Sequence, residues 1–415
     1  MRATLLRALH RVVHPQHAEE QERVERLAKT AATHAAAAKD DAHAIRRQLD
    51  GLSDRVAQLA LDRDVRSLHK QIDQLRDASG RQHRMLQQGL RYAEWEEDLR
   101  TDERRIERRL RRLAKTDQPV LVGPWTGEVG FELLYWVPFV TWALRKAGVS
   151  GDRIVVVSRG GPRAWYAHLG GRYFDVLAQM TPEEFRGQTE ARKKQQGLGP
   201  LDRAVVRRTI GLAGLERPFL LHPGLMYRLF KPFWKQTATV RRIEDYTDYG
   251  LVARPTVSQL AGRLPRDYVA VRFYFSSCFP DTPENRTFVE TTLRSLSAAT
   301  DVVMLNTPFD LDDHRDFSPA QSARIHTVGD LMAAEHNLEV QTAVIAGARA
   351  FVGTYGGYSY LAPLCGVPSL AFYSVREAFF AHHLELAERV FRRLGAGSLV
   401  PLDVRDAGLV RLALS

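Results

Sequence analysis

The segment FVGTYGGYSYLAPLCGVPSLAFYS, residues 351–374, predicts a strand, a glycine loop, a helix and a second strand in immediate succession. The first strand ends at Val352, the loop covers residues 353–357, the helix runs to Cys365, and the second strand covers residues 369–373. In a parallel α/β sheet such a loop lies at the carboxyl ends of the strands, where backbone N–H groups and a helix N-terminus can approach an anion. The same glycines would also suit a simple tight turn, so other parts of the chain must distinguish the two.

The composition places the chain among globular proteins with an anionic partner. Its 415 residues are enough for two or three domains, and a hydrophobic content of 44% supports buried cores. The formal net charge of +10 is compatible with nucleic acid, an acidic membrane surface or a phosphorylated substrate. Two cysteines, Cys278 and Cys365, are too few for a disulfide framework and fit a reducing compartment. Because there is no apolar run of about 18 residues, we expect a cytoplasmic protein without a membrane span.

Residues 1–117 are predicted to form a helical coiled-coil region. The part from residue 19 to residue 115 contains no proline, and apolar residues recur in steps of three and four along it, for example at Ile45, Leu49, Leu52, Val56 and Leu59. The pattern has breaks, and Gly80 and Gly89 interrupt its middle, so we expect a broken coiled coil that makes the protein a homo-oligomer.

Two charged segments of this region bear on its partners. The first 13 residues combine leucines and valines with three arginines, so they form either a basic amphipathic helix that touches the inner membrane face or only a frayed helix start. The arginine run over residues 104–112 is interleaved with Glu103 and Glu107. That alternation favours a solvated helix face, and we expect no nucleic-acid partner.

A first α/β domain is expected over residues 118–258. The strand 119–122 leads into a glycine loop, GPWTGEVGFE at residues 123–132, then an apolar helix over 133–146 and a buried strand over 154–157. Glu128 stands inside the loop and is our candidate general base. The acceptor side of the site is predicted to include Gly127, Glu132, Arg159 and His222, although Glu132 could instead only cap its helix dipole. Arg159 ends the second strand, where it would also suit the 2′-phosphate of NADP.

A second α/β domain is expected over residues 259–415. Arg272 ends its first strand, where a guanidinium could bind a phosphate, or could simply pair at the surface with Asp281 or Glu284. Another strand, over residues 302–306, ends at Asn306. The acidic run at residues 310–314 is too loosely spaced to predict a metal site, so no metal is expected.

Residues 352–368, VGTYGGYSYLAPLCGVP, resemble the donor-site segment of GT-B-fold glycosyltransferases, distantly like bacterial heptosyltransferases and related polysaccharide-assembly glycosyltransferases. In that family the loop reads roughly G-N-D-[ST]-G-x-x-H-L-A, followed by G-[VT]-P. The matching residues here are Gly353, Gly357, Leu361, Ala362, Gly366, Val367 and Pro368. Tyr355 stands at the family's aspartate and Tyr360 at its histidine.

The resemblance implies two Rossmann-like domains and transfer of a sugar from a nucleotide-sugar donor to a glycan or lipid-linked acceptor, without a cofactor or an essential metal. Surface polysaccharide assembly would be the setting. Glu128 would take the acceptor proton, and the donor would be bound by Arg272, Asn306, Tyr355, Gly356, Gly357, Ser359 and Tyr360. Two other functions stay open: a non-catalytic coiled-coil scaffold with a degenerate transferase module, and a nucleotide-sugar epimerase.

Overall fold

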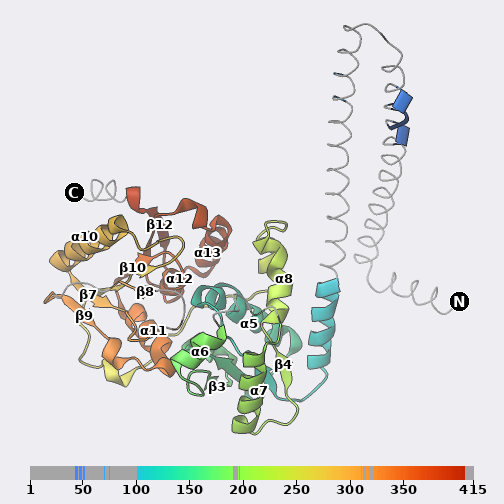
Figure 1. Cartoon of the computed structure of the whole chain (residues 1–415). Coiled ribbons are helices and arrows are strands. Elements are labelled where there is room, and N and C mark those ends of the chain that lie inside the picture. The colour runs from blue at the N-terminus through green and yellow to red at the C-terminus, as the bar shows by residue number, and fades with distance from the viewer. Residues whose placement is uncertain are drawn as a thin grey trace, which may run out of the picture. The chain divides into compact units, whose positions relative to one another are not determined.

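A computed structural model describes residues 43–44, 46–48, 50–51, 70, 74, 101–189, 195, 197–309, 311, 315–317 and 322–406. The chain divides into two compact units, residues 1–104 and 105–415 (Figure 1). In the first unit the described residues are helical, and those between 43 and 74 are exposed. Most of the expected coiled-coil region, and all of the basic segment 1–13, lie outside the described residues.

The second unit contains two parallel sheets covered by helices, as the sequence predicted. The sheet of its first half, residues 105–258, has the strand order β3-β2-β1-β4. These strands are β1 (Val120–Val122), β2 (Ile154–Ser158), β3 (Arg172–Asp175) and β4 (Phe219–Leu221). Every residue of β1 and β2 is buried, because helices cover both faces of the sheet. The sequence did not predict β3, whose side chains are mostly exposed or half-buried and lack an apolar run.

The second half, residues 259–406, is built on a six-stranded parallel sheet with the order β12-β11-β10-β5-β7-β9. Its strands are β5 (Tyr268–Arg272), β7 (Asp301–Met304), β9 (Ile325–Thr327), β10 (Ala350–Thr354), β11 (Ser369–Tyr373) and β12 (Leu399–Asp403). A short antiparallel pair, β6 (Tyr274–Phe275) and β8 (Arg315–Asp316), lies beyond the end of β5. The strand, loop, helix and strand predicted over residues 351–373 are confirmed as β10, α12 and β11.

The helices of the first half follow its strands. They are α4 (Val129–Phe131), a π-helical turn η1 (Glu132–Trp136), α5 (Val137–Ala147), α6 (Pro182–Thr189), α7 (Pro200–Ala213), α8 (Gly224–Trp234) and α9 (Arg241–Glu244). In the second half the helices are α10 (Pro283–Ala299), α11 (Asn337–Gly347), α12 (Gly357–Leu364) and α13 (Ala381–Leu394). None of the helices among the described residues is both long and apolar enough to cross a bilayer.

The helix over residues 101–113 enters the core of the α/β unit. Ile106, Leu110 and Leu113 are buried there. Arg109 donates from Nη2 to the carbonyl oxygen of Leu220, 2.8 Å away, on the edge strand β4. The compact unit therefore starts at Arg105, and the end of this helix belongs to it rather than to the preceding region.

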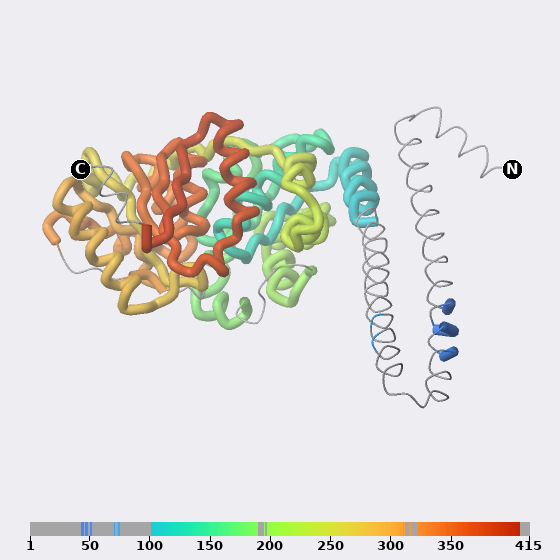
Figure 2. The backbone as a smooth tube through the Cα atoms, turned by 90° about the horizontal axis from the view of Figure 1, so that it is seen from above, coloured from blue at the N-terminus to red at the C-terminus, as the bar shows by residue number. Residues whose placement is uncertain are grey.

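The two halves of the unit contact each other directly. The N–H of Leu338 donates to the carbonyl oxygen of Gly160 at 2.7 Å, and the indole of Trp165 donates to the Thr342 hydroxyl at 3.0 Å. Helix α13 belongs to the second half by sequence, yet its His382 packs on Phe233 of α8 in the first half, with ring centroids 5.4 Å apart. The red segment in Figure 2 runs beside the green first half for this reason.

Candidate active site

The glycine loop after β1 and the glycine loop after β10 meet at the carboxyl ends of their strands. A Cβ atom at Gly357 would lie 2.8 Å from the backbone nitrogen of Gly130 and 2.8 Å from Cγ1 of Val129. A Cβ at Gly130 would lie 3.3 Å from the Cα of Gly357. Because Gly357 has no side chain, the N-terminus of α12 can contact α4 this closely.

The first loop is held by hydrogen bonds from three sides. Gly123 donates to the carbonyl oxygen of Leu221 and Trp125 to that of Val157, both at 2.9 Å. The side-chain amide of Gln195 then accepts from the N–H of Thr126 at 2.9 Å. These bonds fix the loop before it reaches the candidate base.

Glu128 is the exposed carboxylate of the loop. Its backbone is extended, at φ −71° and ψ 148°, and its carbonyl oxygen accepts the N–H of Glu132 at 3.1 Å. Because α4 starts at the next residue, Glu128 lies two positions before Gly130 and thus next to the junction of the two loops.

Glu132 has the opposite environment. It is 1% exposed and accepts hydrogen bonds at Oε1 from the hydroxyls of Ser158 at 2.5 Å and Tyr166 at 2.6 Å. Burial raises the pKa of its carboxyl to about 7, although both hydrogen bonds oppose the rise. Glu132 thus lies beneath the loop as a protonatable buried acid.

Arg159 binds the first loop, whereas His222 binds groups at the start of α8 and on α7. Arg159 is 4% exposed and donates from Nε to the carbonyl oxygen of Gly127 at 3.0 Å. Nδ1 of His222 accepts the N–H of Gly224 at 3.0 Å, and its Nε2 lies 3.2 Å from the buried Asp202. Both of these side chains, predicted to face the acceptor, are bound to the protein itself.

Arg272 at the end of β5 is also bound internally. Its guanidinium pairs with both carboxylate oxygens of Asp316, at 3.0 and 3.2 Å, and donates to the amide of Gln341 at 2.7 Å. It also lies 4.3 Å from the ring centre of Tyr358, in the first turn of α12. The alternative pairing with Asp281 or Glu284 is wrong, because Asp281 pairs with Arg286 instead. Asp316 lies 44 residues away in the sequence, so local spacing could not reveal it.

The second loop uses its polar side chains to hold its own shape. The Ser359 hydroxyl donates to the carbonyl oxygen of Gly356 at 2.7 Å and accepts the N–H of the same residue at 3.1 Å. Tyr360 donates to the hydroxyl of Tyr355 at 2.7 Å, and both rings are buried. Burial raises the pKa of both phenols well above the ordinary value, so both stay neutral. The two residues that depart from the family pattern therefore form one hydrogen-bonded pair.

Asn306 follows the end of β7. It donates from Nδ2 to the carbonyl oxygen of Phe317 at 2.6 Å. Among the described residues, no donor reaches its buried Oδ1 atom. The same part of the chain holds no cluster of three or more His, Cys, Asp or Glu residues suited to a metal ion, and most of the acidic run at residues 310–314 lies outside the described residues.

One group of side chains near the loops was not predicted. The Tyr135 hydroxyl hydrogen-bonds Nδ1 of His383, and the His383 ring packs on Phe131 with centroids 5.4 Å apart. The sequence offered a signal, since two phenylalanines and two histidines follow each other closely at residues 379–383. The contact of His383 with Tyr135 and Phe131 could not be predicted, because these residues are far apart in the sequence.

No protein-family model matches this sequence, and no curated protein does. Three solved structures similar to the chain are the iron-containing dodecameric glycosyltransferase TibC from enterotoxigenic E. coli H10407, the E. coli ADP-heptose lps heptosyltransferase II, and the glycosyl transferase family 9 protein from Veillonella parvula DSM 2008. Their identities to the chain are 13%, 12% and 13%, and their TM-scores are 0.33, 0.35 and 0.37.

The matches cover 64%, 62% and 72% of this chain. They cover 61%, 85% and 89% of the three other chains, so the chain spans less than two thirds of the length of TibC.

Proposed function

We propose that the chain is a glycosyltransferase that moves a sugar from a nucleotide-diphosphate donor to the hydroxyl group of an acceptor. The observation that carries this proposal is the contact between the two glycine loops, Val129–Gly130 against Gly357. It joins an exposed carboxylate in one half to a helix N-terminus in the other, each at the carboxyl ends of a parallel sheet. A general base and an anion-binding helix end are the two groups that such a transfer requires.

In this reaction the Glu128 carboxylate takes the proton of the acceptor hydroxyl while the hydroxyl oxygen attacks the anomeric carbon. The bond between that carbon and the diphosphate breaks, and its electron pair goes to the diphosphate oxygen. The N–H groups at the start of α12, which follows Gly356, stabilise the charge that develops there. We expect these donors to take the place of a metal ion.

Arg272 then acts through α12 rather than on the diphosphate. Its contact with Tyr358 and its pair with Asp316 tie the first turn of α12 to the end of β5. A diphosphate could recruit the guanidinium only by displacing Asp316. Because Gly130 and Gly357 touch, the two halves must also separate before a donor can enter between the loops.

The internal pairing of Arg272 and of Tyr355 with Tyr360 favours a second candidate, a module that binds a glycan or a partner without catalysis. Turnover distinguishes the two, because the binding module releases no nucleotide from any donor. An epimerase would convert the donor alone, without an acceptor.

For the setting, we propose assembly of surface glycans at the cytoplasmic face of the membrane, on a lipid-linked or glycan acceptor. The net charge of +10 supports attraction to an anionic surface. Oligomerisation through residues 1–117 is part of the same proposal. Co-sedimentation with anionic vesicles and light scattering of the full chain test the two parts separately.

The decisive experiment is a thermal-shift panel of UDP-, GDP-, ADP-, CMP- and dTDP-sugars with the full chain. We expect one nucleotide to raise the melting temperature, since a ligand at about 100 times its Kd adds about 2.7 kcal/mol to the free energy of unfolding. If every member of the panel leaves the melting temperature unchanged, the transferase proposal fails.

A further inference from the structure

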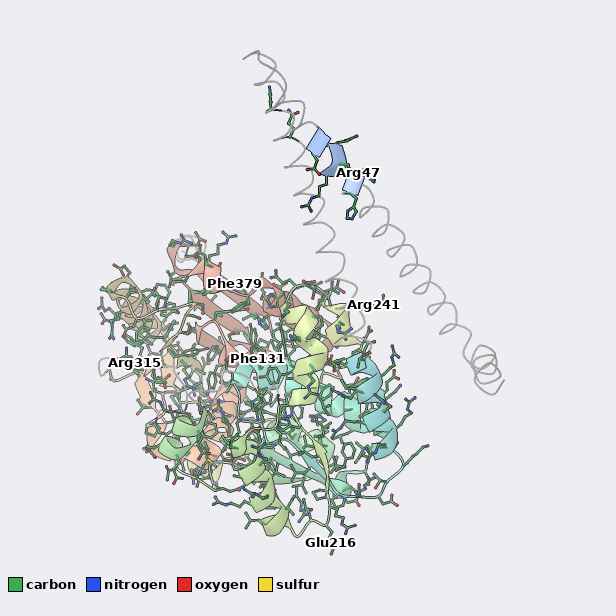
Figure 3. The ribbon with its side chains drawn as sticks, turned by 45° about the vertical axis from the view of Figure 1, so that its right-hand side comes forward. Arg47, Phe131, Glu216, Arg241, Arg315 and Phe379 are labelled. Atoms are coloured by element: carbon green, nitrogen blue, oxygen red, sulfur yellow. The ribbon has the colours of Figure 1, made fainter. Side chains whose placement is uncertain are left out.

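A cluster of aromatic and imidazole rings joins the two halves of the unit beside the first glycine loop. Phe380 and His383, from the segment that enters α13, lie with centroids 5.5 Å apart, and His383 reaches Phe131 of α4 at 5.4 Å. His382 lies 5.8 Å from Phe380. Figure 3 labels Phe131 of the first half and Phe379, the residue that precedes Phe380, of the second half.

The cluster reaches the surface. The side chain of Phe380 is 55% exposed, and Phe131, His382 and His383 are half-buried. A lone exposed aromatic residue needs no explanation. Here the exposed ring continues into two imidazoles and a second phenylalanine, so a ligand could stack on Phe380 and reach polar groups beside it.

Two contacts give the cluster defined polar groups. The Tyr135 hydroxyl, which is fully buried, hydrogen-bonds Nδ1 of His383 and so fixes the orientation of that imidazole. Phe131 directly follows Gly130, the residue of the first loop that meets Gly357, and it lies three positions after Glu128 in the chain. The ring that contacts His383 therefore belongs to the turn that directly follows the first loop.

We propose that Phe131, Phe380 and His383 form the subsite that binds the sugar ring of the acceptor. This inference rests on the proposed transferase function and names the substrate class on its acceptor side. One face of a pyranose ring is made of C–H groups and stacks on an aromatic side chain, while its hydroxyls hydrogen-bond imidazole and carboxylate groups. An acyl chain would find imidazoles instead of an aliphatic lining, and the Glu128 carboxylate repels an anionic ligand at this position.

The test uses the full chain and saturation-transfer NMR with a panel of methyl glycosides of hexoses and deoxyhexoses as probes. We expect at least one glycoside to bind the wild type and to bind Phe380→Ala and His383→Ala about five- to tenfold more weakly. Phe380→Trp keeps a stacking surface and should retain binding. Leu251→Ala, whose side chain is 56% exposed and lies outside the cluster, is the matched control and should bind as the wild type does.

The inference is overturned if no glycoside binds the wild type, or if Phe380→Ala and Leu251→Ala bind equally well. Its failure is distinguishable from failure of the transferase proposal, because Phe380→Ala should show the same thermal shift with nucleotide sugars as the wild type. If a glycoside binds but no nucleotide sugar does, the sugar-binding subsite is supported and the transferase proposal fails.

Discussion

The two glycine loops meet, yet they contribute different things to the candidate site. The first loop carries two carboxylates at different depths, Glu128 exposed and Glu132 buried. The second loop carries no charge, and its Ser359, Tyr355 and Tyr360 hydroxyls bind within the loop itself. The first loop therefore supplies the carboxylates, whereas the second offers a fixed backbone and a helix end.

Arg272 lies beside the second loop, at the first turn of α12. A guanidinium beside an uncharged loop could serve a ligand, but here Asp316 neutralises it within the protein. We therefore expect substitutions in the first loop to change turnover and substitutions around the second loop to change stability.

The largest effect is expected from Glu128→Gln. Loss of a general base should lower turnover by about 10²- to 10⁴-fold and leave nucleotide-sugar binding in the thermal-shift assay unchanged. Glu183→Gln, at another exposed glutamate, on α6, is the control and should keep full turnover. Equal turnover of Glu128→Gln and the wild type would show that Glu128 is not the general base.

Asp316→Ala tests the structural role of Arg272. It leaves a guanidinium that is 10% exposed without its carboxylate, which should lower the free energy of unfolding by about 3 kcal/mol in urea. The matched control is Asp330→Ala, which breaks the exposed pair with Arg263 and should cost less than about 1 kcal/mol. If a nucleotide sugar fully restores the stability of Asp316→Ala, Arg272 binds the diphosphate after all.

Glu132→Gln tests the buried acid through pH. The carboxyl pKa is about 7 in the folded protein against an ordinary value of 4.5, so the folded state holds a proton that the unfolded state has released between these values. The free energy of unfolding therefore falls as pH rises through this window, by up to about 3 kcal/mol. Glutamine keeps a neutral acceptor for Ser158 and Tyr166.

The variant should match the wild type near pH 4.5 and become the more stable of the two by pH 8, in urea titrations across that range. Asp175, whose pKa burial raises to about 6, is present in both proteins and cancels in the comparison. Parallel stability curves for the two proteins would show that Glu132 is charged in the folded state.

Gly357→Ala tests the contact between the loops. Its Cβ would meet the backbone nitrogen of Gly130 at 2.8 Å, so we expect a loss of about 1–3 kcal/mol in the free energy of unfolding. Gly187→Ala, in α6 with no atom within 4 Å of the added carbon, should instead stabilise by up to about 1 kcal/mol. Equal effects of the two alanines would mean that the loops do not touch in solution.

The smallest effect concerns the tyrosine pair. A double-mutant cycle with Tyr355→Phe and Tyr360→Phe should give a coupling energy of about 1 kcal/mol in urea unfolding, the value of one buried hydrogen bond. Additive effects would mean that the two hydroxyls bind other partners.

Much of the fold could be predicted from local pattern. Buried parallel strands such as β1, β2 and β10 contain continuous apolar runs with glycine or proline close by in the sequence, and each was predicted. Strand β3 has no such run, and β12 contains Pro401 and an exposed Val400, so neither was predicted. The end of the coiled-coil region was predicted at residue 117 from the change in composition. Composition could not show that Ile106 and Leu113 pack into the α/β core.

The site was predictable only in part. The sequence identified both glycine loops and distinguished Glu128 as a loop carboxylate. It also placed Arg159, His222 and Arg272 correctly at the ends of their strands. It predicted that these side chains bind a ligand, whereas in the structure they hydrogen-bond groups of the protein. The partner of Arg272 comes from a distant segment, and no spacing rule connects the two.

The sequence by itself determined the local elements, because hydrophobic periodicity and glycine placement depend on residues near each other in the chain. Only the tertiary structure decided which charged side chains are exposed to a ligand and which are paired within the protein. Exposure, pairing and pKa depend on residues that folding brings together from far apart, as Glu128, Glu132 and Arg272 each demonstrate. The same holds for His383, which meets Tyr135 and Phe131 across 248 and 252 positions of the chain because α13 packs against the first half.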